Sequence, residues 1–507
     1  MLPILQYAIA LLAVLLAVKL LTGYWKARPI PEGLGGGAGG AGLPLGTGGG
    51  GGGPGYLPFI GSRAWLAFTE LGKTYGEIFT VPLFTQNVIV LNDIELAREA
   101  FSLNPAFAGR PKSPSFQAFV NSGKSRFALR DGNAQWRFLR RHAVKALSMF
   151  ASSRNSRLEA VSDKGATWLE QQLDKSNGKP MVPKNDIFHC VAGVVGAVLF
   201  GTHFDNSDPL LEKMVSIVRI VQRFVEIGSA TDALPFGGLL FRHRVKAFHK
   251  AIGTINELTE RHILNIDHNF EGEVRDVADA LYVAAKEADP IVLEKVHATR
   301  DQIRFISQDL FAAGFGTTME TMNWCMNIMA TFPEKQARAQ AELDAVLGSD
   351  EKPDLHNRSS LPYTDACLLE CLRWSSLAAM GLPHRVMRDT ELRGYFIPKD
   401  SLVMANLYGH HRDPAYFPEP LQFRPERFLN DDGLLVREVC ERVVPFGVGK
   451  RRCVGENLAR QELFILLARV LSRFVVSAPR PFDIDASGTG FLRVPLEVEL
   501  VFQKRGE

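Results

Sequence analysis

The 507-residue sequence has few cysteines and almost no excess of charge, and both shortages restrict its function. Six cysteines are too few for a disulfide framework, and no pair of CxxC motifs is present to hold a structural zinc ion. The 58 Lys and Arg residues against 55 Asp and Glu leave a net charge of +3, too small for a protein that coats nucleic acid. The 46% hydrophobic content indicates a folded protein of a reduced compartment.

The first 25 residues form an apolar run that predicts one membrane-spanning helix. Leu2–Val18 is almost entirely apolar, and the run to Trp25 reaches the ~20 residues that a helix needs to cross a bilayer. Lys26 and Arg28 follow the run and nothing basic precedes it, so the remainder of the chain is expected in the cytosol. A cleaved signal peptide is the alternative, but its basic start and small-residue cleavage site are not evident.

A glycine-rich segment follows the predicted anchor. Residues 33–55 contain 15 of the 45 glycines, including the run Gly48–Gly53. Such a chain buries little apolar surface, so we expect residues 26–56 to be a flexible, initially basic tether. A phosphate-binding loop is the alternative, but no strand precedes the segment and no Lys-Ser/Thr pair closes it. Residues 57–507 are then expected to form a single domain.

The rest of the chain is expected to be mainly α-helical with small β-sheets. Strands are predicted at Phe79–Val81, Val88–Leu91 and Leu496–Phe502, the last from its alternation of apolar and acidic residues. Helices are predicted at Ile94–Phe101, Ala134–Leu147, Arg157–Leu173, Gln302–Thr331, Glu334–Leu347, Tyr363–Trp374 and Asn457–Phe474. The segment that ends before Pro333 is apolar almost all round, which predicts a helix through the interior.

The segment Phe446–Gly455 carries the strongest functional signal. It fills the pattern Phe-x-x-Gly-x-Arg-x-Cys-x-Gly, and its Cys453 lies just before a predicted helix. The helix N-terminus and the cations Lys450–Arg452 favour the thiolate form of this cysteine. A thiolate is a soft anionic ligand suited to iron. The alternative, a buried cysteine in a glycine turn, does not explain the whole pattern.

This pattern resembles the haem-binding loop of cytochromes P450, and the resemblance extends over roughly residues 57–507. Glu370 and Arg373 look like the helical Glu-x-x-Arg of that family, and Arg427 is similar to the arginine that joins the pair in a structural role. The resemblance implies the cytochrome P450 fold, in which haem b lies between a long buried helix and the cysteine loop. It also implies that Cys453 is the axial ligand of the haem iron.

The chain is most similar to the animal microsomal branch of the family. Asp309–Phe315 looks like aryl-hydrocarbon oxidases, and Glu456–Phe464 resembles steroid 17-hydroxylases. This branch implies a monooxygenase of the endoplasmic reticulum membrane that inserts one atom of O2 into a lipophilic steroid or planar aromatic molecule. It also implies electrons from NADPH through cytochrome P450 reductase, with cytochrome b5 as a further candidate partner.

Several residues match family positions that bind the haem. Trp136 and Arg140 lie at i and i+4 on one predicted helix face, as in the Trp-x-x-x-Arg that donates hydrogen bonds to a haem propionate. The resemblance nominates further haem-binding residues, namely Arg110, His384, Phe446 and Arg451. Taken singly, each could be a solvated charge or a core residue.

The expected oxygen-activating segment lies in the long buried helix. Gly314 is expected to open a groove above the haem, and Thr317 to relay protons. The residue before this Thr is usually acidic in the family, but here it is Gly316. Glu320 is a candidate substitute for proton delivery, and a buried partner for an arginine is the alternative role. Water alone is a second proton source, and an isomerase or dehydratase reaction would need no relay.

Electron delivery is expected at a cationic surface. Arg137, Arg141 and Lys145 recur at i, i+4 and i+8, and Lys450 and Arg452 flank the cysteine. An acidic flavoprotein domain would dock there by charge complementarity. A solvated helix face is the alternative.

The substrate pocket is expected to be apolar and aromatic. Its candidate lining residues are Phe116, Phe119, Phe224, Phe236, Phe311, Ala313, Phe315, Met380 and Phe491. Core packing is the alternative for each phenylalanine. A non-catalytic haem-binding protein is the remaining alternative for the chain, although Thr317 and the cationic surface favour an enzyme.

Overall fold

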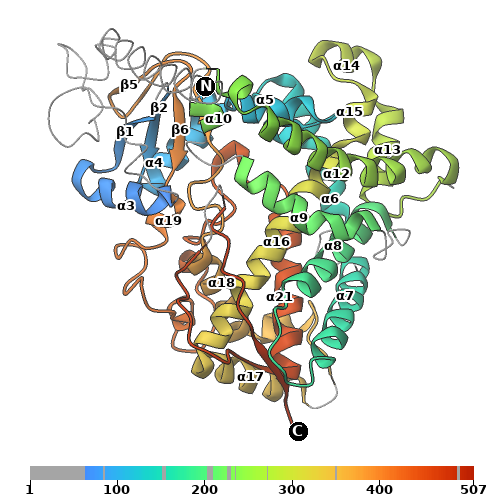
Figure 1. The fold of residues 1–507 in the computed structure, drawn as a ribbon, viewed down its shortest axis with the longest axis vertical. Coiled ribbons are helices and arrows are strands. Elements are labelled where there is room, and N and C mark those ends of the chain that lie inside the picture. Colours follow the sequence, from blue (N-terminus) through green and yellow to red (C-terminus); the bar gives the residue numbers. More distant parts are fainter. Residues whose placement is uncertain are drawn as a thin grey trace, which may run out of the picture.

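The computed structural model describes residues 63–506 except 84–85, 151–155, 202–208, 225–229, 234–235, 271, 349–350 and 488–491. It is mainly helical, with one four-stranded sheet and two two-stranded sheets. Figure 1 shows the larger sheet at one edge of a broad helical body. The predicted anchor (1–25) and the tether (26–56) lie outside the described residues, among which no helix has the length and apolarity to cross a membrane.

The helices are named as in Figure 1. The α-helices are α3 (Ala64–Tyr75), α4 (Ile94–Arg98), α5 (Pro114–Asn121), α6 (Ala134–Phe150), α7 (Ser156–Asp174), α8 (Lys184–Phe200), α9 (Pro209–Phe224), α10 (Ala230–Ala233), α11 (Gly237–Leu240), α12 (Arg242–Asn269), α13 (Val277–Glu287), α14 (Pro290–Val296), α15 (Arg300–Arg304), α16 (Ile306–Thr331), α17 (Pro333–Leu347), α18 (Pro362–Ser375), α19 (Leu407–His410), α20 (Arg437–Cys440) and α21 (Glu456–Arg473). Short 3-10 or π turns are η1 (Glu99–Leu103), η2 (Pro105–Ala108), η3 (Phe127–Leu129), η5 (Asn357–Ser360), η6 (Pro425–Phe428) and η7 (Gly449–Arg451).

The large sheet has the order β1-β2-β6-β3 and joins the two halves of the chain. Its strands are β1 (Ile78–Leu83), β2 (Gln86–Leu91), β6 (Leu402–Ala405) and β3 (His384–Arg385). The β1–β2 pair is antiparallel, whereas β2 runs parallel to β6. The small sheets pair β4 (Thr390–Leu392) with β5 (Tyr395–Ile397), and β7 (Phe474–Ser477) with β8 (Val501–Lys504).

The predicted strands at 79–81 and 88–91 are confirmed, but the predicted strand Leu496–Phe502 is mostly wrong. Within it, Leu500 makes only an isolated bridge to Met181, and the paired strand begins at Val501. Alternation marks the buried face, but a strand also needs a neighbour with free backbone groups. The segment 302–331 is likewise two helices, because α15 ends at Arg304 and α16 begins at Ile306.

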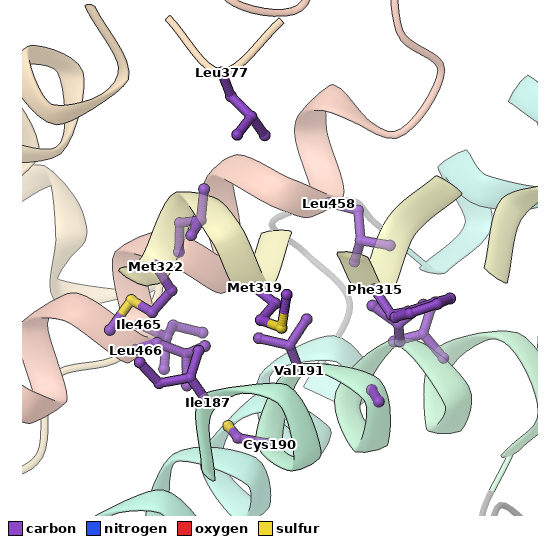
Figure 2. Close-up of a cluster of buried hydrophobic side chains, with 14 of the residues drawn as sticks. Ile187, Cys190, Val191, Phe315, Met319, Met322, Leu377, Leu458, Ile465 and Leu466 are labelled. Carbon is purple, nitrogen blue, oxygen red and sulfur yellow. The ribbon is translucent and has the colours of Figure 1, made fainter. Parts of the chain in front are cut away.

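Helix α16 runs through the interior, as its apolar sequence predicts. Of its 26 residues, only Ala313 and Thr317 are exposed. In Figure 1 it lies beside α8, α21 and α18 at the centre of the body. Figure 2 shows Phe315, Met319 and Met322 of α16 within a cluster of apolar side chains from α8 and α21. The exposed pair therefore marks one short open face on a buried helix.

Gly314 and Gly316 allow neighbouring helices to pack closely against α16. A Cβ at Gly314 would lie 3.3 Å from Val195 of α8, and one at Gly316 would lie 3.5 Å from Val218 of α9. The missing side chain of Gly314 faces α8 and not the open face, so the expected groove above the haem stays a prediction. Small residues let α8 and α9 approach the backbone of α16 closely.

Glu462 is a buried carboxyl at the junction of α21 with α8 and α16. It lies one turn after Leu458 on α21, near enough to Cys190 of α8 to help raise the pKa of that thiol. The side chain is fully buried, and neither of its oxygens has a hydrogen-bond partner among the described residues. Desolvation raises the pKa of Glu462 to about 8, so the folded protein holds it protonated at neutral pH.

This burial predicts a pH-dependent stability. Folding raises the pKa of Glu462, so the free energy of unfolding is highest below the pKa that Glu462 has in the unfolded chain. Above that pKa, the free energy of unfolding falls by about 1.4 kcal/mol per pH unit until the pH reaches the folded-state pKa of about 8. Glu462→Gln removes this dependence. We expect the difference in thermal unfolding midpoint between the variant and the wild type to increase in favour of the variant from pH 6 to pH 8. A constant difference over that range would contradict the assignment.

Candidate functional site

The cysteine loop precedes α21 and is built by two glycines. Gly447 and Gly449 have φ of 75° and 77°, a conformation that side chains disfavour. A Cβ at Gly449 would lie 2.5 Å from the carbonyl of Phe101, so the loop packs directly on η1. The Cys453 N–H donates to the Phe446 carbonyl at 3.0 Å, which closes the loop. This geometry holds the Cys453 side chain at an exposed position.

The electrostatics of Cys453 differ from the sequence-based expectation. Desolvation by the surrounding protein raises the pKa of its thiol, and Glu456 adds to this shift. The Gly455 N–H, Arg140 and Arg452 act in the opposite direction but do not reverse it. Cys453 is exposed, but the protein around it still desolvates the thiol enough to outweigh the expected lowering of its pKa by neighbouring cations. A bound metal ion is the remaining means of stabilising the thiolate, because coordination itself deprotonates a thiol.

The predicted haem-binding cations gather around Trp136 of α6. Arg451 lies over the Trp136 ring with 4.2 Å between its guanidinium carbon and the ring centroid, and Arg140 lies at 5.7 Å. Arg140 also donates to the Arg452 carbonyl at 2.5 Å, which joins α6 to the cysteine loop. Arg451 donates to the carbonyls of Ala108 and Arg130. Residues from three distant segments therefore share one surface.

Arg110 and His384 complete this cluster from the other side. Arg110 is buried and donates to the Pro383 carbonyl at 2.9 Å, so it holds the segment that carries His384. The His384 Nδ1 contacts the Phe107 carbonyl at 2.7 Å, and its ring stacks on Phe101 with 3.8 Å between centroids. Burial and Arg110 lower the pKa of His384 well below its ordinary value, so it is neutral.

The cluster has an excess of positive charge. No ion pair among the described residues joins Arg110, Arg140 or Arg451 to a carboxylate; nearby Asp131 pairs with Arg385 at 2.6 Å. Burial and the neighbouring guanidiniums lower the pKa of Arg110 to about 10 and that of Arg451 to about 8. Half-buried cations without acidic partners favour an anion in contact with them. The two carboxylates of a haem would meet this requirement, so the residues fit the group.

The open face of α16 carries the oxygen-activation candidate. Thr317 is exposed, and its Oγ1 donates to the Ala313 carbonyl at 2.7 Å. This is the ordinary back-bond of a helical threonine, and it holds the hydroxyl at a fixed position on the open face.

Glu320 lies elsewhere. It is 1% exposed and forms an ion pair with Lys184 of α8 at 3.1 Å, and Lys184 also pairs with Glu497 at 3.2 Å. The structure therefore gives Glu320 a buried ion pair, as in the alternative to proton delivery, but its partner is a lysine and not the expected arginine.

The Glu-x-x-Arg pair forms a buried network with the third expected residue. Arg373 donates to Glu370 through Nε at 2.7 Å and Nη2 at 2.8 Å, and the Arg427 Nε donates to the same carboxylate at 3.1 Å. The Glu370 and Arg373 side chains are fully buried, and that of Arg427 is 3% exposed. Both arginines also donate to carbonyls of residues 411–422, so the network fixes the chain that leads to the cysteine loop.

The cationic surface is present as expected, with one weaker member. Arg137, Arg141 and Lys145 are all exposed on α6, and Lys450 is exposed beside the cysteine. Arg452 is exposed but pairs with Glu456 at 2.5 Å, which neutralises part of its charge. The bond from Arg140 to the Arg452 carbonyl brings the two segments together.

The predicted pocket residues do not form a single lining. Phe119 and Phe224 both contact Phe248 of α12, a residue that sequence reasoning missed, with 4.4 and 4.3 Å between ring centroids. Phe311 and Phe315 are core residues, as their alternative role required, since they pack on Phe200 and Phe188.

The other candidates are also dispersed. Phe116 is 7% exposed, Phe236 is 82% exposed, and Met380 is buried in the separate cluster around the large sheet. Phe491 lies outside the described residues. Only Ala313 of the predicted set lies on the open face of α16.

Comparison with known proteins gives one consistent result. The family model "Cytochrome P450" matches residues 53–502. The chain is 32% identical to human cytochrome P450 1A2 over 448 residues, 85% of each chain, and 32% identical to cytochrome P450 1A1 of Chelon saliens over 82% of this chain and 81% of that one. A zebrafish cytochrome P450 structure with progesterone has a TM-score of 0.76 and 29% identity, and covers 87% of this chain and 100% of its own.

The cation cluster predicts how tightly haem is retained. Arg140→Met removes one charge-assisted donor, which contributes about 1.5–3 kcal/mol, so haem should dissociate roughly 10–100 times faster into an excess of apomyoglobin. Arg137→Met on the same helix is the matched control, because Arg137 is exposed and outside the cluster. Equal haem loss from both variants would contradict the assignment.

Proposed function

Because this chain belongs to the cytochrome P450 family and is a P450 monooxygenase with haem b, we propose that Cys453 ligates the haem iron and that the protein oxidises a lipophilic small molecule. The observation that supports this proposal is that an exposed cysteine and a group of cations lie side by side. The Cys453 side chain is exposed on a glycine-built loop, and Arg140 and Arg451 beside it have no acidic ion-pair partner within the described part of the chain. Bound haem supplies the activation of O2 and the oxidising chemistry.

The protein's own residues would position that chemistry. Arg110, Arg140 and Arg451 bind the propionates through charge-assisted hydrogen bonds, with Trp136 and His384 packed between them. Phe446 begins the loop, and Arg460 lies over its ring with 5.0 Å between the guanidinium carbon and the ring centroid. Thr317 presents a hydroxyl on the open face of α16 and moves protons at Oγ1.

Protons would reach Thr317 from water. The usual acidic position is Gly316, which packs toward α9. Glu320 pairs with Lys184 on α8, which supports a role in holding α8 to α16 over a role in proton delivery. An isomerase or dehydratase reaction is not needed to explain Gly316.

The substrate class would be steroid or planar aromatic. The zebrafish relative was solved with progesterone, a neutral steroid. Phe119, Phe224 and Phe248 form an aromatic group between α5, α9 and α12 that suits a flat apolar molecule.

The domain arrangement and partners are part of the same proposal. Residues 1–25 would anchor the protein in the endoplasmic reticulum membrane, residues 26–56 would tether it, and 57–507 would be the cytosolic catalytic domain. NADPH–cytochrome P450 reductase would supply electrons, with cytochrome b5 as a further donor.

Iron ligation by Cys453 is tested with the purified protein. The reduced, carbon-monoxide-treated wild type should show the red-shifted Soret absorption of sulfur-ligated haem, because thiolate donation shifts that band. Cys453→Ala should lose it, whereas the matched variant Cys440→Ala should keep it, since Cys440 lies in α20 outside the loop. A red-shifted band in Cys453→Ala would contradict iron ligation by Cys453.

The cationic surface predicts selective damage to electron transfer. Arg137→Glu with Arg141→Glu reverses two exposed charges on α6. We expect about a tenfold or larger fall in reductase-driven turnover at low salt, with peroxide-driven turnover unchanged, because only docking of an acidic partner depends on these charges. The control variant carries Lys295→Glu with Lys179→Glu, which reverses two exposed charges outside α6. An equal loss of reductase-driven and peroxide-driven turnover would argue against docking at this surface.

A further inference from the structure

Three residues form a stripe along one face of α16. Asp309, Ala313 and Thr317 lie at i, i+4 and i+8, which places them on the same side of the helix. Ala313 and Thr317 are exposed, whereas Asp309 is 7% exposed. The open face therefore ends at Asp309, and something covers that carboxylate.

Arg126 and Phe127 cover the Asp309 carboxylate. The Arg126 Nη1 lies 3.1 Å from Asp309 Oδ1, and the Phe127 N–H donates to Oδ2 at 2.7 Å. The side chains of Arg126 and Asp309 are each 5% exposed. Burial raises the pKa of Asp309, and Arg126 and the Phe127 N–H oppose this shift. The Asp309 carboxylate therefore depends on these two donors for its charge.

The same guanidinium holds two more segments. Its Nη2 donates to Asn256 Oδ1 of α12 at 2.7 Å and to the Ser122 carbonyl, just after α5, at 3.5 Å. The Asn256 amide also donates to the Ser122 carbonyl. One arginine therefore joins α5, α12 and α16 at the end of the open face.

The backbone around Arg126 is shaped for this contact. Arg126 has φ of 46°, in the left-handed region that a non-glycine residue adopts only under constraint. A Cβ at position 123 would lie 2.4 Å from the Arg126 Nε, so only glycine leaves room for the guanidinium there. Both features favour a position built for this ion pair.

We propose that the Arg126–Asp309 ion pair closes one end of the substrate site and makes it selective for uncharged ligands. This inference rests on the proposed function, since the open face of α16 must be the substrate face. The pair neutralises the one carboxylate of the stripe and presents no net charge there. Removing either partner leaves the other as a buried charge that a ligand of opposite sign can neutralise.

The test measures ligand charge preference by equilibrium dialysis of the haem-loaded protein. The probes are pyrene, its trimethylammoniomethyl derivative and pyrene-1-sulfonate, which share one ring system. The wild type should prefer pyrene. Arg126→Met should shift the preference toward the cationic probe by about tenfold or more, and Asp309→Asn toward the anionic probe. The double variant should prefer pyrene again, because both charges are gone.

A second buried ion pair provides the matched control. Arg469 of α21 pairs with Glu170 of α7 at 2.6 Å, with side chains 2% and 5% exposed, and lies outside α16. Arg469→Met should lower the unfolding temperature without changing the charge preference. An unchanged preference in both single variants that still bind pyrene would overturn the inference. If Arg126→Met does not fold, Asp309→Asn and the double variant decide.

The carbon-monoxide difference spectrum separates this inference from the proposed function. A wild type without the sulfur-ligated absorption would remove the proposed function. A wild type that shows this absorption, with single variants that keep the wild-type charge preference, would remove only the role of Arg126.

Discussion

Glu370 and its two arginines are the constraint on which the cysteine loop depends. The carboxylate is fully buried, so it has no water to solvate it and must accept hydrogen bonds from Arg373 and Arg427. The remaining donors of these arginines are then directed at backbone carbonyls of residues 411–422. A chain segment without regular structure becomes fixed in this way, and it precedes η6, α20 and then the loop that carries Cys453.

Arginines that hold irregular backbone recur around the site. Arg110 and Arg451 donate to carbonyls of loops on both sides of Trp136, and Arg493 donates to the Trp374 carbonyl at the end of α18. A guanidinium suits this role because its fork of N–H donors satisfies several carbonyls at once. Around the cysteine, Arg110, Arg140 and Arg451 have no ion-pair partner among the described residues, whereas Arg126 is paired with Asp309. The two ends of the site therefore differ in the ligands that they favour.

Much of the fold could be predicted because local patterns report on burial. The apolar sequence of 306–331 indicated an interior helix, and the short strands at 78–83 and 86–91 follow their β-branched composition. The same patterns were misleading at Leu496–Phe502, where alternation marks a buried face without a paired strand. They also did not distinguish a core phenylalanine such as Phe315 from one that lines a pocket, because both positions are apolar.

The sequence by itself determined the cysteine loop, the buried central helix and the family, because these depend on residue types at short fixed spacings. Tertiary structure alone decided which side chains meet. Arg126 and Asp309 are 183 residues apart, and nothing near either residue marks the other as its partner. Glu320 likewise became an ion-pair partner of Lys184, and Gly314 faces α8. Periodicity specifies which side of an element is buried, but the chain topology determines what that side contacts.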